Sequence, residues 1–118
     1  MENESAGSHV MRLWQAHKAV ISHNILRDPN PDGLQALKLH GPSEASGLVG
    51  RTMFVTITDN VFRGENWGIT IGPRDSINDD RVSQVLFERN RTESIASIQL
   101  DLRIMARHVT VRNNVFDG

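Results

Sequence analysis

Apolar and polar residues alternate along several short segments of this chain, and each alternating segment ends near an asparagine. The stretch VTITDNVFRG, residues 55–64, shows the pattern, and VTVRNNVFDG, residues 109–118, repeats it almost letter for letter. Weaker copies surround two further asparagines, so four related units carry this residue at the same place: Asn24, Asn60, Asn90 and Asn114. An apolar period of two predicts strands that bury one face.

The repeated asparagine suits a tight bend between two strands. Asparagine tolerates left-handed backbone angles and hydrogen bonds neighbouring backbone groups. If the units stack, the four asparagines form a ladder whose amides hydrogen bond from one unit to the next, which would satisfy a buried polar row. We therefore predict a structural role for these asparagines.

A second family of alternating segments lies between the asparagines. It comprises LQALKLHG (residues 34–41), NWGITIG (66–72) and SIQLDLR (97–103), with a vaguer version around Met11 and Leu13. Each unit therefore reads as strand, loop, strand, asparagine bend and short strand. Such units predict an all-β fold, a single-stranded parallel β-helix (solenoid) of about four coils over residues 9–118, after a polar N-terminal segment, residues 1–8.

Two other folds compete with this prediction. An antiparallel sandwich would explain the turn signals, but it gives no reason for an asparagine at a fixed offset from apolar positions. A helical bundle requires an apolar spacing of three or four rather than two. The ends of a four-coil solenoid expose unpaired strand edges, so we expect the chain to be part of a longer β-helix or to associate end to end with a partner or with itself.

Composition narrows the function classes. The chain carries 13 basic and 14 acidic residues and a net charge of −1, without the positive balance expected of a nucleic-acid binder. It has no apolar run long enough to cross a membrane and no cysteine for a disulfide or thiolate metal site. The N-terminus, MENESAGSHV, lacks the basic flank and apolar core of a secretory signal.

Candidate chemistry lies on the outward positions of the second strand family. Stacking would place these side chains about 4.8 Å apart from coil to coil. The set is mixed in charge and would suit an acidic sugar polymer, although a solvated sheet face is the alternative; it comprises Arg12, Lys38, His40, Thr70, Gln99, Asp101 and Arg103. His40 is a natural proton shuttle near neutral pH, and Lys38 could act as a base if neighbouring cations depress its pKa. Trp14 has outward parity and could stack on a sugar ring.

Two longer connections follow these strands and both contain Gly-Pro. GPSEASGLVGRT (residues 41–52) and GPRDSINDDRVS (72–83) would leave the same corner of successive coils and form a wall beside the sheet. Arg74 in the second connection is a further candidate for substrate contact. Its carboxylates, Asp75, Asp79 and Asp80, would suit Ca²⁺, although their spacing is not that of an EF-hand and an ordinary solvated loop is the alternative.

Six motifs resemble bacterial right-handed β-helix proteins of the pectate-lyase-like superfamily, a group that includes proteins described as polysaccharide-degrading. They are ISHN, ALKLHGP, VTITDNVF, WGITIGP, DDRVSQVLFERN and HVTVRNNVFDG, and the resemblance covers roughly residues 10–118. It implies a right-handed coil, a longer, secreted or periplasmic protein, and an acidic polysaccharide as ligand. The paired-aspartate Ca²⁺ cluster on the sheet face is missing from this chain.

The resemblance also implies a reaction. Lyases of this superfamily cleave uronates by β-elimination, in which a base removes the proton next to a carboxylate while Ca²⁺ or a cationic residue neutralises that carboxylate. The candidates for the catalytic roles are Lys38, His40, Asp101 and Arg103, and those for substrate binding are Arg12, Trp14, Thr70, Arg74 and Gln99.

We therefore expect a carbohydrate-active β-helix of lyase type. One alternative is a glycoside hydrolase, which needs two carboxylates, whereas Asp101 is the only one on the expected face. The other is a polysaccharide-binding or structural β-helix without catalysis, as in surface or tail-spike proteins.

Overall fold

The computed structural model describes residues 2–4, 9–28, 35–41, 50–64, 66–72, 82–95, 97–103 and 106–117. Within these ranges the chain forms strands joined by bends and contains no helix, so the prediction of an all-β fold is confirmed. No helix of the described part is long and apolar enough to cross a membrane.

The strands form three sheets, which we name A, B and C. Sheet B contains β2 (His9–Trp14), β5 (Gln35–His40), β8 (Trp67–Ile71) and β11 (Ile98–Leu102). Sheet C contains β3 (His17–Ser22), β6 (Thr52–Thr58), β9 (Val82–Glu88) and β12 (Ala106–Arg112). Sheet A contains β1 (Glu2–Glu4), β4 (Ile25–Asp28), β7 (Val61–Gly64), β10 (Arg91–Glu93) and β13 (Val115–Asp117).

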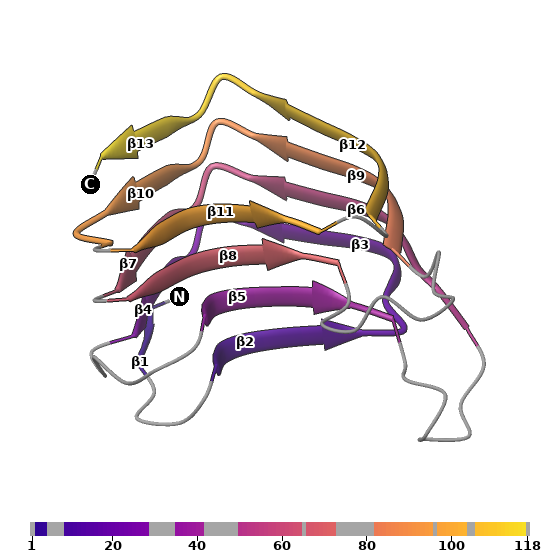
Figure 1. The fold of residues 1–118 in the computed structure, drawn as a ribbon, viewed down its shortest axis with the longest axis horizontal. Helices are drawn as coiled ribbons and strands as arrows, with labels where there is room; N and C mark the ends of the chain where they lie inside the picture. Colours follow the sequence, from indigo (N-terminus) through magenta and orange to yellow (C-terminus); the bar gives the residue numbers. More distant parts are fainter. Residues whose placement is uncertain are drawn as a thin grey trace.

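From β2 onward the chain visits sheets B, C and A in turn, and every described strand pair is parallel. Each circuit, which we call a coil, adds one strand to each sheet, and Figure 1 shows the coils stacked on one another. This arrangement is compatible with a parallel β-helix. The antiparallel sandwich is wrong, because no described strand pair is antiparallel.

The alternating apolar residues meet inside the coils. In sheet C, Ile21, Ile57, Phe87 and Val111 share one register position, and in sheet B Leu13, Leu39, Ile71 and Leu102 share another. The members from the two middle coils are fully buried. Burying a side chain of this size contributes about 1.5–3 kcal/mol, so the middle coils supply most of the core.

The four asparagines form a continuous hydrogen-bonded ladder. Asn90 Oδ1 accepts from Asn60 N at 3.1 Å and from Asn60 Nδ2 at 3.0 Å. The same pair of bonds joins Asn24 to Asn60 and Asn90 to Asn114. The amide nitrogens also donate to carbonyls of the preceding coil, those of Ile21, Ile57 and Phe87. Asn60 and Asn90 are buried, and the ladder satisfies them.

The left-handed backbone at each bend belongs to the residue before the asparagine. The φ angles of His23, Asp59, Arg89 and Asn113 lie between 51° and 57°, and none of the four ladder asparagines has a positive φ. The expectation that asparagine itself adopts this conformation is therefore wrong. The ladder gives the reason, because the preceding residue makes the bend while the asparagine side chain hydrogen bonds between coils.

The two ends of the stack differ. Part of the N-terminal segment, β1, pairs with β4 and so extends sheet A instead of lying apart from the coils. On the last coil, Leu102, Val111 and Phe116 are in register with buried residues of the coil before, yet they are 36–47% exposed. End-to-end association through this coil stays a prediction.

Replacement of Asn90 by alanine should cost far more stability than replacement of Asn24. Asn90→Ala removes the acceptor of the buried Asn60 N–H, and each buried polar group left without a partner costs about 1–3 kcal/mol. Asn24→Ala removes only side-chain donors, and Asn60 Oδ1 keeps the bond from the Asn24 backbone. In urea unfolding we expect losses of about 2–4 kcal/mol and about 1 kcal/mol, respectively. Equal losses would contradict the ladder.

Candidate functional site

The register brings together most of the polar side chains predicted to face outward from sheet B. Arg12 pairs with Lys38, Lys38 with Thr70, and Thr70 with Asp101, so these residues form one row across all four strands. Trp14 pairs with His40 in the next row. The backbone bonds from Gly72 N to Leu39 O and from Arg103 N to Ile71 O carry the pairing on to Arg103. We call this set the sheet B face: Arg12, Trp14, Lys38, His40, Thr70, Asp101 and Arg103.

The middle of the sheet B face is not an open groove. Lys38 and His40 are each 8% exposed and Thr70 is fully buried, whereas Trp14 is 43% exposed. Long side chains from the edge strand contribute to this burial, because the Arg12 guanidinium lies against His40 and the Trp14 ring meets the imidazole edge-on, with centroids 5.9 Å apart. The expectation of solvent-facing Lys38, His40 and Thr70 is therefore wrong.

Hydrogen bonds fix the tautomer of His40. Arg12 Nε donates to His40 Nε2 at 2.6 Å, and an arginine can only donate. Nε2 is therefore the acceptor, and Nδ1 carries the hydrogen that it donates to Gly41 O at 2.7 Å. Burial lowers the pKa of His40 to about 4; the bond to Gly41 opposes this effect, and the nearby charges of Arg12 and Lys38 reinforce it. His40 is thus neutral near pH 7, with both ring nitrogens engaged.

An exposed aromatic ring and a cation lie together at the edge of this face. The Arg12 guanidinium carbon is 5.7 Å from the centroid of the Trp14 ring, a cation–π distance. Both side chains belong to β2, and both are exposed. They are the most exposed side chains of the sheet B face, and Asp101 and Arg103 are partly exposed.

The last strand of the face carries an ion pair. Arg103 Nε lies 2.9 Å from Asp101 Oδ2, so this carboxylate is already neutralised. Gly72 precedes Arg103 in the same row. A Cβ at Gly72 would lie 2.8 Å from the Arg103 Cβ. In addition, the φ of Gly72 is 120°, which is strained for any other residue. Glycine is therefore needed beside Arg103.

Of the remaining predicted residues, Gln99 does not present its amide on this face. The Gln99 side-chain oxygen accepts a hydrogen bond from Thr92, a buried residue of β10, so the expected outward, ligand-ready amide is wrong. Arg74, Asp75, Asp79 and Asp80 lie outside the described residues. Within the described ranges, no group of three or more histidine, aspartate or glutamate side chains could hold a metal ion. A Ca²⁺ site in the second connection stays a prediction.

Sequence reasoning missed a second surface, on the outer side of sheet C. A hollow of about 380 Å³ lies over β6, β9 and β12, and its lining includes Phe54, Thr56, Gln84, Leu86, His108 and Thr110. We call it the sheet C groove. Phe54, Gln84 and His108 have φ values of 52–56°, a conformation that costs roughly 1–2 kcal/mol for a residue with a side chain. The only sequence signal was the break in alternation at Phe54, directly before the inward Val55.

Comparison with family models, with curated proteins and with solved structures finds no match for this chain.

Acid should destabilise the protein through His40. An unfolded histidine titrates near 6.5 and folded His40 near 4, so between these values the unfolded chain binds more protons. The stabilising effect of neutral His40 is complete above about pH 6.5 and is lost as the pH falls toward 4. We expect His40→Gln, which keeps a donor and an acceptor, to show a smaller fall in Tm than the wild type between pH 7 and about 4.5. Parallel Tm profiles would contradict the assignment.

Proposed function

We propose that this chain is a right-handed parallel β-helix and that its sheet B face binds an acidic polysaccharide. The parallel pairing in all three sheets and the regular circuit through them support the fold. The observation that carries the ligand class is the exposed Trp14 ring beside the Arg12 guanidinium, in register with Lys38 and His40. The proposal also includes export from the cytoplasm, because the protein would meet such a polysaccharide outside the cell.

The charge of the face supports an acidic ligand. It carries three cationic side chains, Arg12, Lys38 and Arg103, against one carboxylate, that of Asp101. The whole chain has a net charge of −1, so this local excess of positive charge is not a property of the surface in general. Positive potential attracts polyanions, while the indole offers an apolar plane for the C–H face of a sugar ring.

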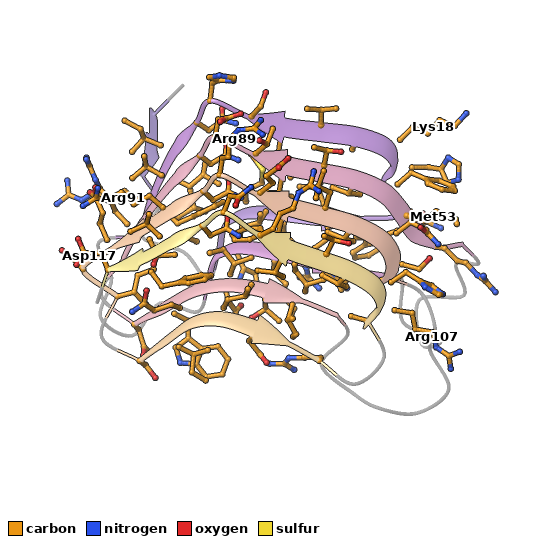
Figure 2. All side chains as sticks on the ribbon, turned by 90° about the horizontal axis from the view of Figure 1, so that it is seen from above. Lys18, Met53, Arg89, Arg91, Arg107 and Asp117 are labelled. Atoms are coloured by element: carbon orange, nitrogen blue, oxygen red, sulfur yellow. The ribbon has the colours of Figure 1, made fainter. Side chains whose placement is uncertain are left out.

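Binding of polygalacturonate, alginate and hyaluronate can be measured by calorimetry with the whole chain. We expect Arg12→Gln and Trp14→Ala each to raise Kd about tenfold, equivalent to about 1.4 kcal/mol, and added salt to weaken binding. Arg91→Gln is the matched control, because Arg91 projects from sheet A, away from this face (Figure 2). Equal weakening by Arg91→Gln, or equally tight binding of uncharged dextran, would contradict the proposal.

β-Elimination at the same face is a second candidate function. His40 is unprotonated at neutral pH because burial lowers its pKa to about 4, as a general base requires. The lone pair on His40 Nε2, however, accepts a hydrogen bond from Arg12 Nε at 2.6 Å. A substrate carboxylate would first have to draw Arg12 away. Lys38, its neighbour on β5, is the other candidate base.

The lyase hypothesis predicts unsaturated products. The whole chain, incubated with each acidic polymer with and without Ca²⁺, should then develop ultraviolet absorbance that His40→Gln abolishes. Absence of this absorbance in the presence of measurable binding would exclude the lyase and leave the binding function intact. Reducing ends without unsaturation would indicate hydrolysis instead.

A further inference from the structure

Every strand of sheet C carries a residue with positive φ at the same register position, and three of these residues line the sheet C groove. Lys18, Phe54, Gln84 and His108 all have positive φ, and the strand pairing passes over them: Met53 pairs with Ser83 and Val55 with Val85. Two successive side chains in each strand therefore lie outside the core. Figure 2 shows Lys18, Met53 and Arg107 projecting outward at this bend.

None of these four residues is a glycine, which would adopt a positive φ without strain. Phenylalanine is among the less expected residues in this conformation, because bulky side chains rarely adopt it. Phe54 is nevertheless 49% exposed, so core packing does not account for its ring. An unusual backbone conformation that holds an aromatic ring toward solvent suggests a binding role.

The lining of the groove is amphipathic. His17 meets the Phe54 ring edge-on, with centroids 5.5 Å apart and planes at 84°, which leaves ring surface available. Leu86 adds apolar area on the next strand. Hydroxyls from Thr56 and Thr110 flank it in the same row, and the Gln84 amide and the His108 imidazole can donate or accept hydrogen bonds.

Among the described residues that line the groove, the charged one is Arg112, and it is paired. Arg112 Nε lies 2.8 Å from Glu88 Oε1, and Arg89 bridges Glu88 at 3.1 Å and Asp59 at 2.9 Å. The bond from Arg89 holds the pKa of Asp59 at about 2, so its carboxylate is charged and compensated. The positive charge of Arg112 in the lining is therefore neutralised by Glu88, and the groove favours an uncharged ligand.

The direction of the groove argues against a peptide. It crosses β6, β9 and β12, and β6 and β9 are each paired on both sides. An extended peptide binds most readily by adding to a free strand edge, which the groove floor over β6 and β9 does not offer. A ligand with an apolar face and hydroxyls at its rim matches the ring, the leucine and the polar side chains. We propose that the sheet C groove binds a neutral oligosaccharide, independently of the acidic ligand at the sheet B face.

The test measures binding of four neutral sugars to the whole chain by saturation-transfer NMR and calorimetry. The sugars are cellohexaose, maltohexaose, mannohexaose and chitohexaose. Phe54→Gly removes the ring and relieves the positive φ. It should therefore weaken binding at least tenfold while Tm stays unchanged or rises. Gln84→Gly should act in the same direction, since it removes the neighbouring amide at another strained position. Trp14→Ala, on the sheet B face, is the control and should leave binding of the neutral sugars unchanged.

Three results would overturn the inference: no member of the panel binds, Phe54→Gly binds as the wild type does, or an extended peptide library binds the groove while the sugars do not. Failure of acidic polysaccharides to bind would affect only the sheet B proposal, because the two faces are tested with different ligands and different variants.

Discussion

The structure depends on the hydrogen bonds that four asparagines make from coil to coil. Parallel strands of this length could slide along one another, and a slip by one residue would turn every core side chain outward. The ladder opposes such a slip, because Oδ1 of Asn60, of Asn90 and of Asn114 accepts from the backbone N–H and the amide of the asparagine in the coil before it. It fixes one point of every coil, and the apolar rows then pack in register.

The outer surfaces follow from this register. Residues that are far apart in the sequence, such as Arg12, Lys38 and Asp101, become neighbours in one row only because their strands are aligned. The same alignment stacks the positive-φ residues of sheet C, and three of them, Phe54, Gln84 and His108, line one groove. The two surfaces differ in charge: cations predominate at the sheet B face, whereas Arg112, the charged residue in the lining of the sheet C groove, is neutralised by Glu88.

The sequence was sufficient to predict the strands, the core rows and the asparagine positions, since all three depend on a local period and a repeated residue. It correctly indicated that Arg12, Lys38, Thr70 and Asp101 would share a face. It could not show that His40 would be buried under Arg12, because this contact depends on the rotamers of long side chains on a neighbouring strand. The bond from Thr92 to Gln99 likewise joins two different strands, and parity alone does not reveal it.

Hydrogen exchange of the ladder amides tests the central role of the asparagines most directly. The backbone N–H groups of Asn60 and Asn90 donate to the next asparagine of the ladder, so they should exchange only through global unfolding. The Asn114 N–H, at the end of the ladder, has no acceptor among the described residues and should exchange much faster. If the Asn60 and Asn90 amides exchanged as fast as that of Asn114, the ladder would not hold the coils together.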